Sequence, residues 1–443
     1  MNPPNRHSND TLGIQLPARP PFLDVVTGFV ESSVRALGMG REEALKLRLA
    51  AEEIFSYIIS HVRPVEPVDI RAVNGLYYGR VEFRFSVAAL NMGALNITAT
   101  GQFESDEALA EMGLVIASRT VDRLRITEES RGRICLAVEK EKTYPPLPDV
   151  AHPPAPFREG LTIQRTPDAE TLKQYAGEVA RGRADSPGPA FFDYPGKVVD
   201  MVAAGDNEVI AAVDGAGRVA GGILFRFLTE RIVEIVGPHV FDPSREQEIA
   251  EALLDAAIAA VARTRAIGLV SLTGLPEPVR SQFEPLGSLA FFRDEGPALA
   301  RPAWYRFLHE DPGCPVWTNG ALKDFLEREY GRLFLARDIR EVRDLGETKK
   351  GSSIFSAEIR RERSEVVLRP LWPGDDLAAN VERHIRFLRE EGFLNLLFEI
   401  DLGVSWQAPL VPVLLGRRFR PGMIIPFAGQ ADLVVFQYHE TRP

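Results

Sequence analysis

The hydrophobic pattern of the first 142 residues changes from helical to strand-like along the chain. In the range 22–37 apolar residues recur three or four positions apart, which predicts an amphipathic helix that Gly38 ends. A second helix is expected over 41–61, and strict alternation over 80–87 predicts a strand. Weaker patterns predict three more strands, at 68–73, 94–99 and 134–138, and one more helix, at 109–121. Helices on one face of a mixed sheet make this part an α+β sandwich.

The rest of the chain shows one strand–helix–strand pattern twice. The first copy has a strand, a long alanine-rich helix and a strand, at 231–240, 245–265 and 267–272. Before it come a strand, a helix and a hairpin, at 160–165, 169–181 and 209–225. The second copy repeats the strand, the helix and the strand at 365–371, 375–391 and 394–400, and further apolar segments follow at 409–419, 423–426 and 432–438. The recurrence predicts two related α/β units in tandem.

A proline-rich segment separates the two parts of the chain. Six prolines between Pro145 and Pro156 cannot continue a helix or a sheet, so this segment is expected to be a poorly packed linker. A weaker break lies at 310–315. The predicted organisation is a disordered tail, an N-terminal domain, a linker and two further domains, with bounds 1–14, 15–142, 143–159, 160–310 and 316–443.

Composition narrows the class of protein. The 443 residues carry a formal net charge of −10, which argues against a nucleic-acid surface, because such surfaces are basic. No run of 18 apolar residues occurs, so no membrane span is expected. The two cysteines, Cys135 and Cys314, have no metal-ligand spacing, and the histidines are scattered. A cytoplasmic protein without a metal centre is expected.

The N-terminal domain resembles the anti-sigma-factor serine kinases of the histidine-kinase-type ATPase superfamily. The motifs that carry the resemblance are Leu47–Ile59, Thr98–Gly101, Met112–Ile116 and Gly132–Leu136. In that family a Glu on the second helix activates a water or hydroxyl, and Glu53 falls on its position. An Asn one turn later holds Mg²⁺, but Tyr57 stands there. The resemblance aligns Ala99 with the Asp that binds adenine, and it aligns Gly101 and Gly113 with glycines of the nucleotide site.

Three interpretations of Glu53 and Tyr57 stay open. They can be interior and rim residues of a helix, part of a surface for another ligand or partner, or the remains of a working ATP site. Neither Tyr57 nor Ala99 offers the polar group that the family uses, and each lost buried hydrogen bond costs about 1–3 kcal/mol, so ATP is expected to bind weakly or not at all. The resemblance also implies a protein partner, a sigma factor or an antagonist, and a possible homodimer.

The segment 160–310 resembles the GNAT acetyltransferases in its order of elements and in the motif Val219–Gly222. That family binds the coenzyme A pyrophosphate at the N-terminus of the long helix, through Arg/Gln-x-x-Gly-x-Gly/Ala. Arg245 and Ala250 match this pattern, whereas Glu248 replaces the central Gly and adds a negative charge. Phe283 stands where a catalytic Tyr is common. Glu234 is either a general base or, more simply, a solvated residue of an edge strand.

The sequence thus predicts an α+β protein in which a histidine-kinase-type ATPase-like sandwich precedes tandem GNAT-like domains. We expect it to act by binding a protein or a ligand, with catalysis weak or lost. The alternative is a working enzyme, either an ATP-dependent serine/threonine kinase or an acetyl-CoA-dependent N-acyltransferase. ATP with Mg²⁺ and acetyl-CoA are implied by the resemblances alone, and the sequence leaves the true ligand open.

Overall fold

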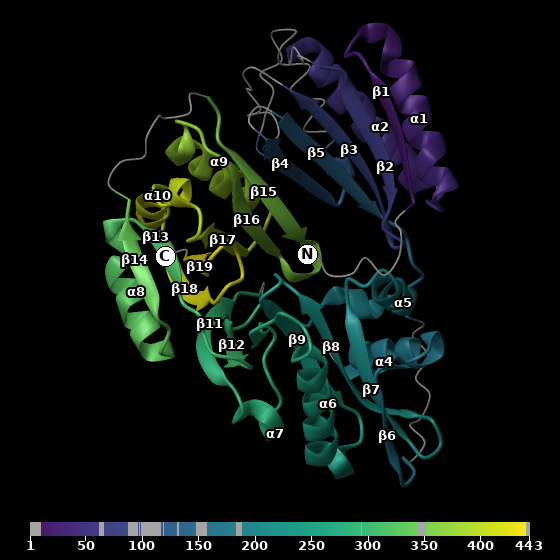
Figure 1. Ribbon diagram of the computed structural model, residues 1–443, viewed down its shortest axis with the longest axis vertical. Helices are drawn as coiled ribbons and strands as arrows, with labels where there is room; N and C mark the ends of the chain where they lie inside the picture. The colour runs from purple at the N-terminus through teal and green to yellow at the C-terminus, as the bar shows by residue number, and fades with distance from the viewer. Residues whose placement is uncertain are drawn as a thin grey trace.

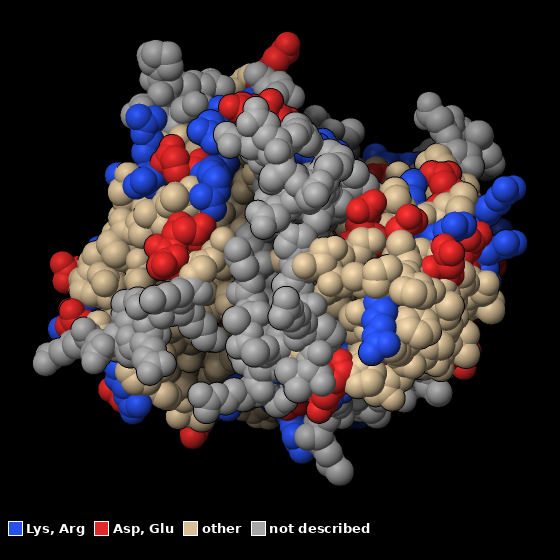
Figure 2. All heavy atoms as spheres, turned by 90° about the horizontal axis from the view of Figure 1, so that it is seen from above, with Lys and Arg blue, Asp and Glu red and all other residues tan. Residues whose placement is uncertain are grey.

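A computed structural model of the 443-residue chain has a mixed α/β architecture with several sheets (Figure 1). The structure describes residues 10–61, 66–86, 96, 98, 117, 119–130, 133–147, 157–182, 188–293, 295–342 and 351–439. On the face seen in Figure 2, acidic and basic side chains of these residues are intermixed and neither sign dominates. Within the same residues, no helix is long and apolar enough to cross a membrane.

The N-terminal module is a five-stranded antiparallel sheet with two helices on one face. Its strands are β1 (Thr11–Leu16), β2 (Val68–Asn74), β3 (Tyr78–Ser86), β4 (Arg123–Ser130) and β5 (Arg133–Glu141), in the order β1-β2-β3-β5-β4. Helices α1 (Leu23–Ala36) and α2 (Arg41–His61) pack their apolar sides on the sheet, as the helical spacing predicted. The range 94–99, for which we predicted a strand, and most of the predicted helix 109–121 lie outside the described residues.

The first strand corrects the predicted N-terminal tail. Residues 11–14 were assigned to a disordered segment, but β1 pairs antiparallel with β2 over the whole of Thr11–Leu16. The strand is mostly exposed; Leu16 is buried in the core, and Ile14 packs against it. Backbone hydrogen bonds therefore hold β1 in place, and these leave little trace in the hydrophobic pattern.

The first α/β unit is a seven-stranded sheet with one parallel pair at its centre. Its strands are β6 (Leu161–Gln164), β7 (Glu208–Asp214), β8 (Val219–Phe227), β9 (Ile232–Val240), β10 (Gly268–Ser271), β11 (Glu284–Phe291) and β12 (Leu299–Phe307), in the order β11-β12-β10-β9-β8-β7-β6. The helices are α4 (Ala169–Gly182), α5 (Pro195–Ala203), α6 (Glu246–Val261) and α7 (Glu277–Arg280). Strands β9 and β10 are parallel, and α6 connects them. Helices α4 and α6 pack on opposite faces.

The second α/β unit repeats the later half of the first. Its sheet has the order β15-β16-β17-β19-β18, and its parallel pair, β16 with β17, is joined by α9. The bounds are β15 (Ile354–Arg360), β16 (Glu365–Trp372), α9 (Leu377–Glu390), β17 (Asn395–Asp401), α10 (Leu410–Gly416), β18 (Phe419–Ile425) and β19 (Leu433–Tyr438). Before it stand β13 (Cys314–Thr318), α8 (Gly320–Leu333) and β14 (Arg337–Glu341), for which we predicted no elements.

One hydrophobic cluster contains residues of both α/β units, and side-chain amides also join the two units. Gln437 of β19 exchanges hydrogen bonds with both backbone groups of Ala290 in β11. Asn395 of β17 does the same with Phe292: the Phe292 N–H lies 2.8 Å from Asn395 Oδ1, and Asn395 Nδ2 lies 2.9 Å from the Phe292 carbonyl oxygen. Each amide thus replaces a neighbouring strand along the free edge of β11. A core cluster that runs from Leu289 to Phe436 crosses this junction.

The start of the proline-rich segment is packed, contrary to our prediction. The Tyr144 hydroxyl donates to Asp200 of α5 over 2.5 Å, and the Leu147 N–H donates to the Asp193 carbonyl over 2.8 Å. Tyr77 and Tyr78 of the N-terminal module form a small apolar cluster with Met201 of α5. Residues 148–156 lie outside the described part of the chain. The prolines prevent regular structure here, but not contact with neighbouring side chains.

Asn96 lies at the contact between the N-terminal module and the second α/β unit. The buried Asn96 amide donates to the Ser353 carbonyl over 2.8 Å and accepts from the Phe355 N–H over 3.0 Å. Asn380 of α9 also donates to the Ser353 carbonyl. Ile354 lies between these partners in the chain and packs in the core of the N-terminal module. The two parts are therefore joined by apolar and polar contacts together.

Replacing Asn96 with alanine should destabilise this junction by about 2 kcal/mol, because the buried Phe355 N–H loses its acceptor and the Ser353 carbonyl loses one of its two donors. The free energy of unfolding from urea titration measures the effect. Asn96→Asp keeps the acceptor for Phe355 but loses the donor to Ser353, so it tests the two bonds separately. A stability of Asn96→Ala equal to that of the unmodified protein would contradict the assigned contact.

Candidate functional site

The centre of the seven-stranded sheet holds Glu234, which we predicted as a candidate base. Glu234 is buried on β9, the middle strand, and Arg226 of β8 lies directly opposite it in the register. The Arg226 Nε donates to Glu234 Oε2 over 2.7 Å. The alternative interpretation, a solvated edge residue, is therefore wrong. The sequence could have indicated Arg226 as the partner. Counting residues outward from the turn of the β8–β9 hairpin places Arg226 opposite Glu234.

Strands β9 and β10 separate directly after Glu234. The parallel pairing covers only Ile232, Val233 and Glu234, while β9 continues to Val240 along β8 alone. Val233 and Ile235 pack with α6, so Glu234 points to the opposite face of the sheet. A bulge in the β8–β9 ladder follows. The site thus combines a buried ion pair with the point at which the parallel pairing of β9 and β10 ends.

The N-terminus of α6 carries acidic groups where the resemblance implies a phosphate site. Arg245 precedes the helix and binds Glu248 through two hydrogen bonds, of 2.7 and 2.9 Å, and the Gly160 carbonyl through a third. This pairing holds the pKa of Glu248 below its usual value. Glu246 also lies in the first turn, and Asp242 accepts from Ser244 just before it. The positive end of the helix dipole is therefore already matched by carboxylates.

Other residues that we assigned to the site have packing roles. Ala250 is fully buried in the core between α6 and the sheet, and Phe283 lies in the same cluster. Gly222 allows the ring of Tyr175 to approach β8, since a Cβ there would lie 2.6 Å from the ring. The Tyr175 hydroxyl lies 2.9 Å from His239 Nδ1. The motif Val219–Gly222 thus reflects close packing of helices on both faces.

On α2 the structure describes two of the five residues assigned to the nucleotide site. Glu53 is half-buried, and burial raises the pKa of its carboxyl group. Tyr57, one turn later, is 5% exposed and packs in the core of the N-terminal module. Ala99, Gly101 and Gly113 lie outside the described residues. In the described part of the chain, no group of three or more His, Cys, Asp or Glu side chains is arranged to hold a metal ion.

No protein-family model and no curated protein matches this chain. Among solved structures, it is similar to a phosphinothricin acetyltransferase from Sinorhizobium meliloti in complex with AcCoA, with 19% identity over 34% of this chain and 89% of that chain, at a TM-score of 0.28. An aminoglycoside 6'-acetyltransferase type Ii is 16% identical over 34% of this chain and 99% of that chain, at a TM-score of 0.28. A GNAT-family acetyltransferase from Staphylococcus aureus Mu50 is 15% identical over 34% of this chain and 99% of that chain, at a TM-score of 0.26.

These similarities concern a third of the chain and identify no activity for it. The first α/β unit has a parallel β9–β10 pair joined by α6, and a hairpin, β11 with β12, that returns beside β10. The ATPase-like interpretation of the N-terminal module has no counterpart among these neighbours.

Proposed function

We propose that this chain is a regulatory protein in which the acetyltransferase-like unit serves binding and assembly and does not transfer acyl groups from coenzyme A. The occupied N-terminus of α6 is the observation that carries the proposal. Glu248 and Glu246 stand in the first turn, and Arg245 is engaged by Glu248 and by a backbone carbonyl. A pyrophosphate approaching this turn would meet two carboxylates, so its binding is disfavoured.

The N-terminal module fits the same proposal. Anti-sigma-factor kinases, which it resembles, act on protein partners, and we propose a partner of that class for this module. Tyr57 is buried in the core, so it supports the module's packing and offers no metal ligand. The contact of Asn96 with the second α/β unit supports a function in which the modules work as one body.

An acyltransferase is the second candidate, and one observation favours it. The parallel pairing of β9 and β10 ends at a buried carboxylate, Glu234, in the middle of the sheet. A buried carboxylate is a candidate acceptor for the proton of an amine, but Arg226 already occupies Glu234 Oε2 through Nε at 2.7 Å and Nη2 at 2.6 Å. Phe283 has no hydroxyl to act as an acid. The chemistry of the site therefore supports binding over transfer.

Titration with coenzyme A tests the proposal. The unmodified protein should show no binding at micromolar concentrations by isothermal titration calorimetry. Glu248→Gly should raise the affinity by about tenfold or more, because it removes a negative charge next to the phosphates and uncovers the backbone amides. Glu248→Gln removes the negative charge and keeps a side chain of similar size, so it separates the effect of the charge on coenzyme A binding from the effect of side-chain size.

Glu251→Gln is the matched control, since Glu251 lies one turn further along α6 and outside the first turn. It should leave the affinity unchanged. Micromolar binding of coenzyme A by the unmodified protein, or release of free thiol from acetyl-CoA with an amine present, would refute the binding role and favour the acyltransferase.

A further inference from the structure

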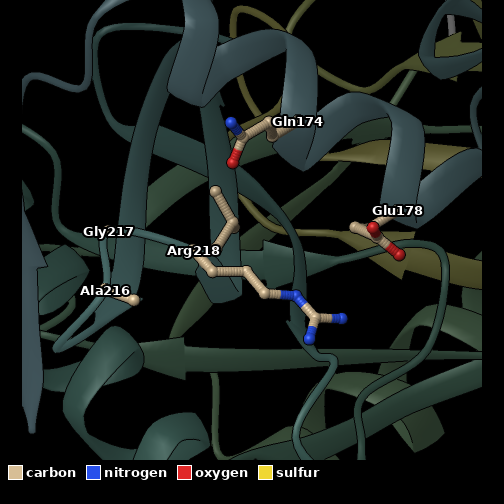
Figure 3. A pocket seen from close by; sticks show the side chains of 6 residues that line it. Gln174, Glu178, Ala216, Gly217 and Arg218 are labelled. Atoms are coloured by element: carbon tan, nitrogen blue, oxygen red, sulfur yellow. The ribbon is translucent and has the colours of Figure 1, made fainter. Parts of the chain in front are cut away.

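A small polar pocket lies between α4 and the turn that joins β7 to β8. Its volume is about 370 Å³, and Gln174, Glu178, Ala216, Gly217, Arg218 and Val219 line it (Figure 3). The pocket is on the α4 face of the sheet, whereas α6 packs on the other face. It is therefore separate from the position where the resemblance implies coenzyme A. This volume is near the lower end of the range for ligand-binding pockets, so the pocket fits a small molecule.

Arg218 supplies a positively charged group that interacts electrostatically with Asp214 but forms no ion pair within 4.0 Å in the described part of the chain. Within the described residues its Nη1 is buried and makes no hydrogen bond, and no ion pair joins its guanidinium to an acid. The guanidinium carbon lies 3.9 Å from the centre of the Phe157 ring, a stack that fixes the plane of the group. Asp214, on the same turn, accepts backbone N–H groups from Arg158, Ala216 and Arg218 itself.

The α4 side of the pocket supplies a carboxylate and an amide. Gln174 and Glu178 are one turn apart on the helix, and in Figure 3 the Arg218 side chain extends from the turn toward the side where Glu178 stands. Glu178 uses one oxygen, Oε1, to accept from Arg181, its neighbour on the helix surface. No contact within 4.0 Å joins Glu178 to Arg218 in the described structure, so each retains capacity for a ligand placed between them.

From this arrangement we infer that the pocket binds a free α-amino acid. The planar fork of Arg218 matches a carboxylate, and Glu178 accepts from an ammonium group. Gln174 can donate to the carboxylate or accept from the ammonium. One cation and one anion on facing walls complement a molecule that carries both charges, and Val219 and Ala216 face its side chain. The inference is independent of the proposed function and would make this unit an amino-acid sensor.

Thermal unfolding of the full-length protein with each of the common L-amino acids at millimolar concentration tests the inference. At least one should raise the midpoint, since a ligand that binds only the folded state stabilises it. For that amino acid, calorimetry compares the parent compound with its amide, which lacks the carboxylate, and its N-acetyl derivative, which lacks the ammonium. Each derivative should bind about tenfold more weakly or worse, because one charge-assisted hydrogen bond is lost.

Matched variants assign the binding to this pocket. Arg218→Gln and Glu178→Gln should each weaken it by about tenfold or more, and Lys173→Gln, on α4 but paired with Glu170 outside the lining, should not. Arg218→Lys keeps the charge without the fork and should give an intermediate affinity; it also serves if Arg218→Gln fails to fold. The inference is overturned if no amino acid shifts the midpoint, if either derivative binds as well as the parent, or if Arg218→Lys and Glu178→Gln both retain full affinity.

Discussion

Replacing Arg337 with methionine should lower the free energy of unfolding by about 3–5 kcal/mol, the largest effect we expect from one substitution. Arg337 of β14 has a fully buried side chain. Its Nε donates to Asp432 over 2.7 Å and its Nη1 donates to Asp311 over 2.6 Å. Asp432 is itself fully buried and also accepts from the Phe427 N–H. Without the guanidinium, two carboxylates would remain in the interior with no opposite charge.

Arg340→Met on the same strand is the control for this effect. Arg340 pairs with Asp338 at an exposed position, where an ion pair contributes about 0–1 kcal/mol. Urea unfolding of both variants, followed by tryptophan fluorescence, measures the difference. Adding Asp432→Leu to Arg337→Met should recover part of the stability, because an apolar pair costs less than an unpaired buried charge. Equal stability of the two arginine variants would show that the buried cluster contributes nothing.

Acidification from pH 7 to pH 5 should cost the protein about 2 kcal/mol of stability through His384 alone. His384 of α9 is fully buried beside Phe355, with Nδ1 2.9 Å from the Asn380 carbonyl oxygen. Burial lowers the pKa of His384 to about 4. The unfolded chain has the ordinary value near 6.5 and binds the proton first, so stability is complete above pH 6.5 and falls as the pH drops toward 4.

His384→Gln should remove this pH dependence, and His309→Gln, at an exposed position, should keep it. The melting midpoint at pH 7 and pH 5 is the measurement. Arg383 and Asp376 are the charged groups that influence His384, and His439 has a lowered pKa as well, so the effect is read as the difference between the unmodified protein and the variant. Glu365, whose pKa its arginine neighbours lower, loses its contribution only below about pH 4.5. A pH dependence that is the same in His384→Gln would contradict the assignment.

The local pattern of apolar and polar residues was sufficient to predict an element where that element is long and amphipathic. The spacing of apolar residues gave the second helix its observed bounds, Arg41–His61, and located the α6 and α9 helices to within a few residues at most ends. The repeated strand–helix–strand order predicted two related units, and in each of them the structure has a parallel pair joined by the helix, β9 with β10 and β16 with β17. Long periodic segments are predictable because each residue's exposure follows from the geometry of one element.

The contacts that join the modules were not predictable in this way. Asn96, Gln437 and Asn395 each bind backbone groups of a distant segment, and no local feature distinguishes them from surface amides. The strand β1 was missed for the same reason, since it is held by backbone hydrogen bonds to β2, which is distant in the sequence. Glu234 shows the converse error, because a lone charge on a strand looked solvent-exposed until the strand order placed β9 in the middle of the sheet.

The sequence by itself determined the mixed α/β character of the chain and the repeated strand–helix–strand order, because these depend on residue type and spacing along one element. Only the tertiary structure decided that Glu248 is paired with Arg245, that Arg226 neutralises Glu234, and that Arg218 faces Glu178 across a pocket. Charges and polar groups acquire their chemistry from the partners that folding brings within a few ångströms, and those partners come from other parts of the chain.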